Sequence, residues 1–581
     1  AAKEAGFGAR IDSLFGKYVV GPIGAVLMPI ILYVLTTVDP LGDSFKVCCT
    51  ALGMAGAFFF VPLNAFLQDN AGEERRGRVV AASNLLTNLL VMALIGFHAY
   101  LSNTLKISAL NELLVMVVPC VLLAIYIVVL LPQALFRTVT IITSRFLYRV
   151  SLSGAENLPR EGGALLLCNH VSYADPVLIG ANVPREIQMI AFSGLTESRF
   201  MRLVFWLTST IPVSPTRAKD AIVKASDRLR EGDAICIFPE GGISRLGPLL
   251  SFKKGFELIA RKGGVPVVPA YLDGVWGSIF SFSGGKFFRK IPNKLPYPVR
   301  LRVGEPIPAG EAKAEHVRKV IQRLSREAFS ERSEIHRPLA EALRTALRRG
   351  TGKPLVLTNG ETKWTRGEFL RRLENSPDGV EDIAVDDDAP VTDEAVLSLA
   401  ARALAEREIR TGGIPWPAPE LLASVLRVSE TNLWDESAFR VRLEGSLDSA
   451  WDQTWRLWAP LFGGFTVRDE GDGTLTLGLP GEPEGSVANT FDGLAVPGLG
   501  VVAMNLPDPP EDWNPDGQKG SAEGSQGRLL PGVEARVLAL GSETELPVGE
   551  TGELEIAGVA GDWIKADLRA CFDEEGFLWL S

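Results

Sequence analysis

The hydrophobic pattern divides the chain into an apolar front and a more mixed remainder. Four stretches near the front each contain about 20 mostly apolar residues, the length that a helix needs to cross a bilayer. They are residues 17–38, 45–67, 80–101 and 110–132. They also contribute strongly to the hydrophobic content, which is 46% of 581 residues. The pattern therefore predicts four transmembrane helices within residues 1–134.

Basic residues are distributed unevenly around these four stretches. The loops DPLGDS and SNTLKIS contain one lysine between them, whereas the other flanks are basic. The basic flanks contain Lys3, Arg10, Lys17, Arg75, Arg76, Arg78, Arg137, Arg145 and Arg149. Because lysine and arginine are retained on the cytoplasmic side, both ends of this block should be cytoplasmic. We expect a multi-pass protein of the inner (cytoplasmic) membrane whose soluble domains face the cytoplasm.

The stretch VPLNAFLQDNAGEERRGRVVAASNLLTNL, residues 61–89, resembles the late cytoplasmic loop of major facilitator transporters of the lysophospholipid type. The resemblance implies the last four spans of such a fold, and because the chain begins without methionine we expect a fragment. These transporters bind substrate between two helical halves, so four helices would serve as an anchor or remnant. His98 in the third stretch is either a functional intramembrane group or, as we favour, a hydrogen-bonded residue of helix packing.

The segment LFRTVTIITSRFLYRVSLSG, residues 135–154, mixes bulky apolar side chains with arginines. This composition favours a helix that lies in the headgroup plane of the membrane. An ordinary amphipathic core helix is the alternative.

From about residue 150 to 310, short apolar runs alternate with helical segments. The runs GALLLCN, AICIFPE and VPVVPAYLDG are typical of buried strands, and AKDAIVKASDRLREG and KKGFELIARKGG are typical of helices. The alternation predicts an α/β domain, which we place at residues 135–335 with the interfacial helix at its start. Each run ends in polar, glycine or proline residues, where an α/β sheet usually carries its chemistry.

His170, one of four histidines, follows the first of these runs, and Asp175 comes five residues later. In a turn that leads into a helix, this spacing can bring the carboxylate to one ring nitrogen and leave the other free to take a proton. No G-x-S-x-G motif is present to supply a serine nucleophile, so the nucleophile would be a hydroxyl of the substrate. Taken alone, the spacing of His170 and Asp175 is also compatible with a histidine that has only a structural role.

Three segments, NHVSYAD (169–175), FPEGGISR (238–245) and VPVVPAY (265–271), resemble the first, third and fourth motifs of the glycerophospholipid acyltransferase family. The resemblance implies that His170 and Asp175 activate a glycerol hydroxyl to attack an acyl thioester. The substrate-binding residues that it implies in these motifs are Asn169, Glu240, Gly241, Gly242 and Pro269. Glu240 and the glycines would help to hold the glycerophosphate. Pro269 would line the acyl chain, although its run is equally compatible with a plain buried strand.

The second motif departs from the pattern of that family. The chain reads IPVSPTRAK at 211–219, with Pro215 where many members have an arginine. Arg217 is then the candidate for the phosphate contact, with a solvated arginine at a helix start as the alternative. Lys253 and Lys254 are equally compatible with a phosphate or lipid contact and with a solvated basic face.

An acidic stretch at about 371–396 is typical of a surface loop or flexible connection. Beyond it, GSQGRLLPGVEARVL (524–538), GELEIAG (552–558) and DEEGFLWLS (573–581) resemble late segments of adenylate-forming enzymes. The whole order resembles a family of fusion proteins that join a lysophospholipid transporter, a 2-acylglycerophosphoethanolamine acyltransferase and an acyl-(acyl carrier protein) synthetase.

The third part also departs from its family. It contains no glycine-rich phosphate loop of the TSGSxGxPKG kind, and Ala495 and Val496 stand where that family has threonine and glutamate. The chain stops at Ser581, before the position of the ribose-binding aspartate. We therefore expect residues 336–581 to be a degenerate adenylate-forming-like α/β domain with a docking or structural role.

Charge and cysteine content exclude several other classes of function. The net charge of −10 and the sequence pI of about 5.3 argue against nucleic acid as a partner. The six cysteines show no CxxC pair, so we expect no metal, and no cofactor beyond an acyl thioester as co-substrate. The expected function is a lysophospholipid O-acyltransferase whose partners are membrane lipids, the lysophospholipid and a thioester of acyl carrier protein or coenzyme A. A lysophospholipid transporter or scaffold fragment with non-catalytic soluble domains is the alternative.

Overall fold

The computed structural model describes residues 21–71, 75–130, 132–214, 218–283, 295–349, 354–356, 363–375, 393–430, 438–442, 448–463, 466–469, 474–478 and 490–581. The chain forms two compact units. The first contains Ala1–Leu147, Gly180–Arg185 and Phe192–Pro212, and the second contains Tyr148–Ile179, Glu186–Ala191 and Val213–Ser581. Each unit is considered by itself.

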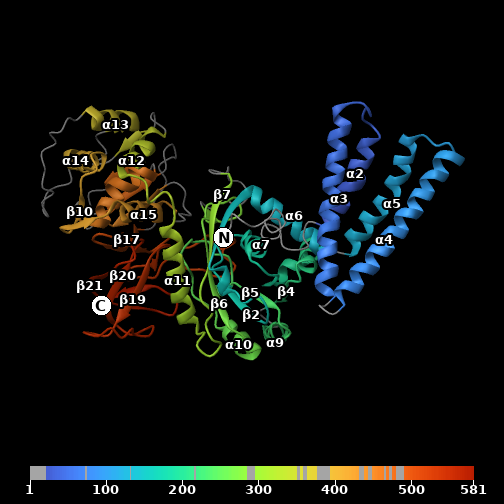
Figure 1. The fold of residues 1–581 in the computed structure, drawn as a ribbon. Coiled ribbons are helices and arrows are strands. Elements are labelled where there is room, and N and C mark those ends of the chain that lie inside the picture. The colour runs from blue at the N-terminus through green and yellow to red at the C-terminus, as the bar shows by residue number, and fades with distance from the viewer. Residues whose placement is uncertain are drawn as a thin grey trace. The chain divides into compact units, whose positions relative to one another are not determined.

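The first unit is helical (Figure 1). Its helices are α2 (Gly21–Leu35), α3 (Asp43–Asn70), α4 (Arg76–Ala99), α5 (Ala109–Leu130), α6 (Pro132–Leu147) and α8 (Arg199–Leu207). A π-helical turn at Tyr100–Thr104 extends α4, and a 3-10 turn at Ser193–Glu197 precedes α8. Three described segments are long and apolar enough to cross a membrane, namely Asp43–Ala65, Arg76–Thr104 and Ala109–Leu130.

The first of the four predicted spans is described only from residue 21 onward. Its described part contains α2, Gly21–Leu35. Residues 17–20 of this predicted span lie outside the described residues. The major facilitator fold of the segment stays a prediction.

His98 near the end of α4 contacts Glu112 in the first turn of α5, with 2.8 Å between Nδ1 and Oε2. A hydrogen bond between neighbouring helices is what the packing interpretation of His98 requires.

The second unit contains most of a mixed sheet whose strand order is β1-β7-β6-β2-β5-β3-β4. Its strands are β1 (Tyr148–Ser153), β2 (Ala164–Cys168), β3 (Ile187–Phe192), β4 (Ile211–Val213), β5 (Ala234–Ile237), β6 (Val267–Asp273) and β7 (Tyr297–Val303). The strand β2 pairs in parallel with both β5 and β6. Every residue of β2 and β6 is buried, as their continuous apolar runs predict for strands covered on both faces.

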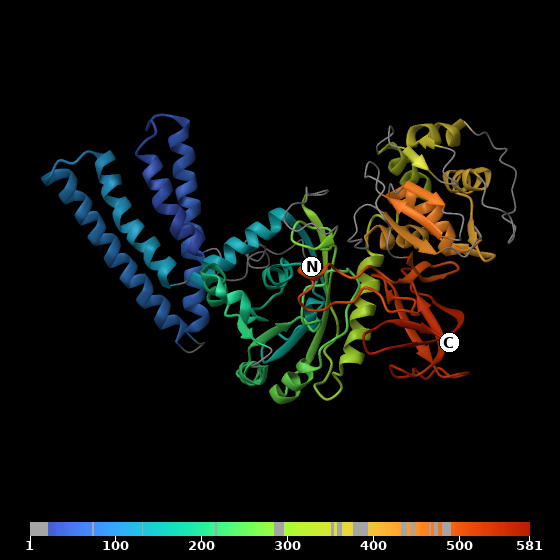
Figure 2. The same ribbon diagram turned by 180° about the vertical axis from the view of Figure 1, so that it is seen from behind.

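Helices cover this sheet and connect it to the rest of the unit. They are α7 (Asp175–Asn182), α9 (Ala218–Arg230), α10 (Gly255–Gly263) and α11 (Ala314–Ser330), with a 3-10 turn at Ala155–Asn157. The long helix α11 contacts β6 and β7 on one side and β19 (Glu534–Leu538) on the other. Figures 1 and 2 show it between the sheet and the C-terminal strands. The sheet and the C-terminal part therefore share one covering helix.

The C-terminal part of this unit has a helical core and a β core. Its helices are α12 (Leu339–Arg348), α13 (Arg366–Asn375), α14 (Asp393–Leu404), α15 (Ala418–Ser429), α16 (Ala450–Gln453) and α17 (Ala459–Gly463), with a π turn at Thr454–Trp458 and a 3-10 turn at Glu511–Trp513. Two hairpins are β8 (Pro354–Val356) with β9 (Lys363–Thr365), and β10 (Ile409–Thr411) with β11 (Ile414–Trp416). A four-stranded sheet contains β12 (Ala438–Arg442), β13 (Thr466–Asp469), β14 (Thr474–Gly478) and β15 (Thr490–Phe491).

The β core adds two antiparallel sheets. One contains β16 (Gly493–Val496), β17 (Gly500–Met504) and β18 (Arg528–Leu529), and the other contains β19, β20 (Gly552–Ala557), β21 (Trp563–Phe572) and β22 (Leu578–Leu580). The acidic stretch 371–396, predicted to be a loop or connection, is helical at both described ends, in α13 and α14. The prediction fails there because Leu373 and Val396 are buried in the helical core; residues 376–392 lie outside the description.

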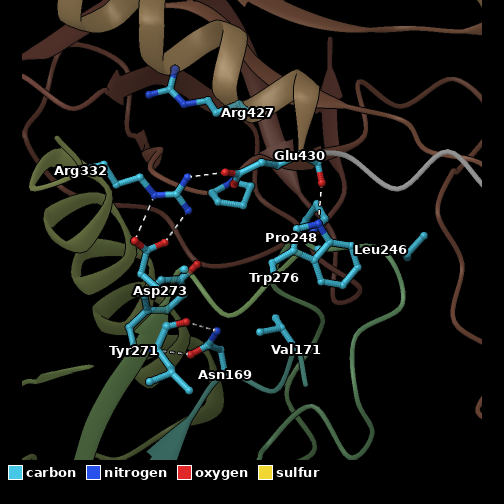
Figure 3. Close-up of a pocket in the computed structure, with 14 residues that line it drawn as sticks. Asn169, Val171, Leu246, Pro248, Tyr271, Asp273, Trp276, Arg332, Arg427 and Glu430 are labelled. Atoms are coloured by element: carbon cyan, nitrogen blue, oxygen red, sulfur yellow. Dashed lines mark hydrogen bonds and ion pairs between the residues drawn. The ribbon is translucent and has the colours of Figure 1, made fainter. Parts of the chain in front are cut away.

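A small cavity lies where the end of β6 faces α15 (Figure 3). Its volume is about 20 Å³, which is room for little more than a water molecule. Asn169, Tyr271, Trp276 and Arg427 are among its lining residues. The cavity is therefore too small for a lipid chain.

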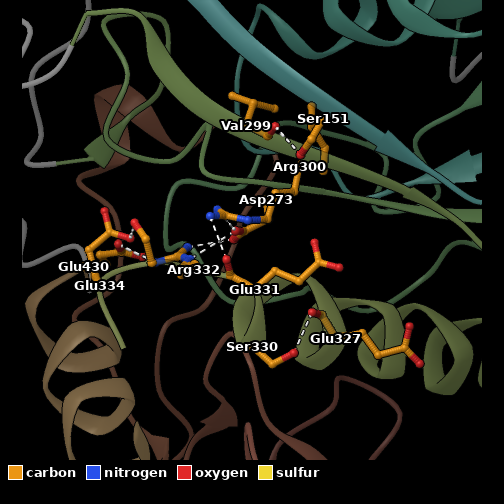
Figure 4. A network of polar contacts seen from close by, with 12 residues as sticks. Ser151, Asp273, Val299, Arg300, Glu327, Ser330, Glu331, Arg332, Glu334 and Glu430 are labelled. Atoms are coloured by element: carbon orange, nitrogen blue, oxygen red, sulfur yellow. Dashed lines mark hydrogen bonds and ion pairs between the residues drawn. The ribbon is translucent and has the colours of Figure 1, made fainter. Parts of the chain in front are cut away.

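Arg332, just after α11, connects the sheet to the C-terminal helices beside this cavity (Figure 4). Its guanidinium donates two hydrogen bonds to Asp273 at the end of β6, over 3.0 and 2.6 Å, and one to Glu430 after α15, over 2.7 Å. All three groups lose water, which costs free energy. Although burial opposes the charge, the two carboxylates raise the pKa of Arg332 above its ordinary value. The contact is stable only while all partners are present.

Replacing Arg332 should therefore destabilise the second unit. In Arg332→Ala, the buried Asp273 loses its bidentate partner, a change that typically costs about 3–5 kcal/mol. We expect the unfolding temperature of the detergent-solubilised chain to fall by roughly 10 °C. Arg228→Ala, which removes a half-exposed ion pair on α9, is the matched control and should cost less than 1 kcal/mol, or about 2 °C. Equal melting of both variants would contradict this role of Arg332.

Candidate active site

The carboxyl ends of β2, β5 and β6 bring three separate segments of the sequence together. His170 follows β2 by two residues, and Glu240 follows β5 by three. Because β2 and β5 are parallel neighbours, the residues after them emerge at the same edge of the sheet. The candidate residues of the first and third motifs therefore meet at this edge.

The structure brings His170 and Asp175 into contact, as their spacing predicts. Asp175 Oδ2 lies 2.9 Å from His170 Nδ1 and also accepts hydrogen bonds from the backbone N–H groups of Val171 and Ser172, over 2.7 and 2.9 Å. Asp175 is fully buried in the first turn of α7. Three donors converge on one oxygen, so the turn itself fixes the direction of the carboxylate.

The imidazole of His170 is held in one orientation. Phe238 stacks on it, with 3.9 Å between the ring centroids and 16° between the planes. A carboxylate at Nδ1 favours the tautomer that carries the proton there, which leaves a lone pair on Nε2. Within the described ranges Nε2 makes no hydrogen bond, and the side chain keeps 14% of its surface exposed. The geometry suits a base that removes a proton from a bound group.

Glu240 connects the loops of the first and third motifs. Its Oε1 accepts from the backbone N–H of His170 over 2.7 Å, and its Oε2 accepts from the N–H of Leu250 over 2.9 Å. Both carboxylate oxygens thus accept hydrogen bonds from backbone N–H groups. In this structure Glu240 therefore holds the first-motif loop and the third-motif loop together. Burial raises the pKa of Glu240 to about 7, against the opposing effect of these two hydrogen bonds.

The neighbouring glycines allow the third motif to fold tightly. Gly241 has a φ of +81°, where a side chain would be strained, and Lys253 packs against it. A methyl group at Gly242 would lie 2.8 Å from the carboxylate of Asp516. The backbone N–H of Ser244 donates to the carbonyl oxygen of His170 over 2.7 Å, which closes the third motif onto the first.

Asn169 and Pro269, both predicted to bind substrate, lie in the interior. The amide of Asn169 makes two hydrogen bonds with the backbone of Leu272 in β6, over 3.1 and 2.7 Å, and continues the pairing of β2 with β6. Pro269 is buried in β6, near Gly304 and Leu324. The position of Asn169 is compatible with a structural role. The position of Pro269 is compatible with the alternative that its run is a plain buried strand.

The remaining candidates differ in what the structure describes of them. Arg217 lies outside the described residues. Lys253 and Lys254 are exposed, and Lys254 is 4.0 Å from Glu574. In the described ranges, no group of three or more His, Cys, Asp or Glu side chains is arranged to hold a metal ion.

The sequence reasoning missed Phe238 and two residues of the C-terminal part, Asp516 and Gln518. Phe238 precedes the glutamate of the third motif, and its aromatic character next to a strand end was a usable signal. Asp516 and Gln518 lie about 270 residues after the segment that they contact, and no local pattern marks them.

Comparison with known proteins identifies the segment that carries this site. Residues 149–273 match the family model described as Acyltransferase. A 1-acyl-sn-glycerol-3-phosphate acyltransferase from Borreliella burgdorferi is 30% identical over 127 residues, which are 21% of this chain and 51% of that protein. The protein of the same name from Bacillus subtilis is 28% identical over 160 residues, 27% of this chain and 73% of that protein. The chain thus spans about half the length of the Borreliella relative.

Two solved structures are similar to parts of the chain. The 1-acyl-sn-glycerophosphate acyltransferase from Thermotoga maritima has 24% identity and a TM-score of 0.27, over 33% of this chain and 78% of that one. A long-chain-fatty-acid-CoA ligase from Archaeoglobus fulgidus has 12% identity and a TM-score of 0.29, over 42% of this chain and 84% of that one.

The family match and the sequence relatives define residues 149–273 as an acyltransferase domain. In this domain the chain is similar to 1-acyl-sn-glycerol-3-phosphate acyltransferases.

The raised pKa of Glu240 predicts a pH dependence of stability. Its carboxyl group is protonated in the folded chain up to about pH 7, whereas the ordinary pKa is 4.5. Its contribution to stability is therefore retained at low pH and lost as the pH rises toward 7 and above. We expect the free energy of unfolding to fall by something of the order of 3 kcal/mol between pH 5 and 8 from this group.

The measurement is the unfolding temperature of the detergent-solubilised chain across this pH range. Glu240→Gln should flatten the pH dependence, since the amide cannot ionise, whereas the exposed Glu305→Gln should retain it. A slope that is the same in all three proteins would exclude Glu240 as its source.

Proposed function

We propose that this chain is a membrane-bound acyltransferase that moves an acyl chain from a thioester to the free hydroxyl of a lysoglycerophospholipid. The observation that carries the proposal is the His170–Asp175 pair at the strand edge, with Nε2 of His170 left without a partner among the described groups. The family of residues 149–273 and the names of the sequence relatives support a lipid acceptor.

The proposed reaction uses His170 as a general base. Its Nε2 takes the proton of the acceptor hydroxyl while the hydroxyl oxygen attacks the carbonyl carbon of the thioester. The new C–O bond forms, the C–S bond breaks, and the leaving thiolate takes the proton from His170. Asp175 holds the ring and stabilises its protonated form. The reaction needs no resident cofactor, since the thioester supplies the activated acyl group.

The proposed donor is a thioester of acyl carrier protein or coenzyme A. The third-motif loop with Gly241 and Gly242 would approach the glycerophosphate, and Arg217 would contact its phosphate. Three helices that are long and apolar enough to span a bilayer support membrane association. In this proposal they anchor the enzyme in the inner membrane as a remnant of a major facilitator fold, with the site on the cytoplasmic side.

Removing the base should abolish most of the activity. We expect His170→Ala to lower kcat for acyl transfer at least about 100-fold, the usual effect of losing acid–base catalysis. Asp175→Asn should lose less, because the ring remains stacked on Phe238 but is poorly oriented. The assay offers the purified chain lysophosphatidic acid or lysophosphatidylethanolamine with acyl carrier protein or coenzyme A thioesters.

The matched control is His316→Ala, since His316 is an exposed histidine on α11. It should retain wild-type turnover. Near-normal transfer by a folded, membrane-inserted His170→Ala protein would end the proposal.

The C-terminal part should not produce its own activated acyl group. Adenylation requires donors that cradle the triphosphate, yet residues 336–581 contain no glycine-rich phosphate loop, and Ala495 and Val496 lie in β16. We expect no fatty-acid-dependent release of pyrophosphate from ATP, whereas a preformed acyl thioester supports transfer in the same sample. Pyrophosphate release that depends on both fatty acid and the purified chain would overturn this expectation.

A further inference from the structure

A loop of the C-terminal part is in contact with the third motif. The amide of Gln518 accepts from the backbone N–H of Arg245 over 3.0 Å and donates to the carbonyl oxygen of Ile243 over 2.9 Å. Asn514 bonds to the backbone of Gln518 in both directions, which holds the loop in shape. Gln518 is only 9% exposed, so this contact is part of the folded interior.

The same loop places a carboxylate beside the candidate acceptor site. Asp516 Oδ2 lies 3.0 Å from Nη1 of Arg245 and would lie 2.8 Å from a methyl group at Gly242. The side chain of Arg245 is 8% exposed, whereas that of Asp516 is 45% exposed. The arginine is therefore covered and already compensated, and the carboxylate is the partner that faces solvent.

Chain connectivity places this ion pair close to His170. Arg245 directly follows Ser244, whose N–H donates to the carbonyl oxygen of His170. Both charges of this ion pair also influence the pKa of Tyr173, three residues after His170. Its pKa is raised chiefly by burial; Arg245 lowers it and Asp516 raises it. Asp516 thus adds negative potential to the loop between the first and third motifs.

We propose that Asp516 is a specificity-determining residue that disfavours acceptors whose headgroup is a phosphomonoester. This inference rests on the proposed function. A phosphomonoester carries a charge of about −1.5 to −2 at neutral pH. It would meet the solvent-facing carboxylate of an ion pair whose arginine is already engaged and so does not attract it. A phosphodiester carries a single negative charge and is repelled less.

Asp516 lies outside the segment that this chain shares with its relatives. Those relatives are named for 1-acyl-sn-glycerol-3-phosphate, which is a phosphomonoester. The family match ends at residue 273, so Asp516 lies outside it. The carboxylate is therefore a feature that the C-terminal part adds to an acyltransferase site. Repulsion built against one ligand is a common way to separate two similar ligands.

The test compares two acceptors on the chain of residues 1–581. Lysophosphatidic acid and lysophosphatidylethanolamine with the same acyl chain are offered with one thioester donor, and kcat/KM is measured for each. In Asp516→Asn, the ratio of kcat/KM for the phosphomonoester to that for the phosphodiester should rise about tenfold, because the like charge is gone while the side-chain shape is kept. Asp516→Ser provides a second neutral variant.

The matched control is Asp512→Asn, which removes the same charge from an exposed position four residues earlier. It should leave the ratio unchanged. If kcat/KM rises equally for both acceptors in Asp516→Asn, the carboxylate blocks the site for any acceptor. If kcat/KM falls equally for both, the carboxylate only supports the loop. Either result leaves the ratio unchanged and overturns the inference. A wild-type chain that acylates neither acceptor, with the acyl carrier protein thioester or with the coenzyme A thioester tested separately, would instead refute the proposed function.

Discussion

One buried carboxylate determines the relation between the two loops on which the site depends. Glu240 accepts from the backbone of His170 with one oxygen and from the backbone of Leu250 with the other. The parallel pairing of β2 and β5 brings these loops to one edge, but pairing alone does not set their conformation beyond the strand ends. The hydrogen bonds of Glu240 and of Ser244 supply that constraint. A buried acid without its two backbone donors would be strongly unfavourable, so the loops and the acid stabilise one another.

The C-terminal part of the second unit is structurally joined to the acyltransferase sheet. Helix α11 covers the sheet on one side and contacts β19 on the other, and Arg332 connects the end of β6 to Glu430. Gln518 and Asp516 then reach the third motif itself. A part whose sequence departs from the nucleotide-binding pattern thus remains in direct contact with the acyltransferase motifs.

Sequence patterns predicted those elements that local composition determines. The long apolar runs correspond to α3, α4 and α5, the short ones to β2, β5 and β6, and the spacing of His170 and Asp175 corresponds to their contact. The acidic stretch around residues 371–396 was misjudged because its average composition hides a few buried apolar positions such as Leu373. The interior positions of Asn169 and Pro269 depend on the neighbouring strands, which a single segment does not reveal. Contacts such as Arg245 with Asp516 join residues with no shared periodicity, and only the tertiary fold specifies them.

The convergence of three donors on a single oxygen of Asp175 has a further consequence. The same atom closes the turn through Val171 and Ser172 and positions the imidazole through Nδ1. The tautomer and orientation of the imidazole are therefore set when the turn folds, before any ligand arrives. In the proposed reaction, no tautomer exchange would have to precede the encounter with an acceptor. The orientation of the ring belongs to the folded ground state and needs no ligand to set it.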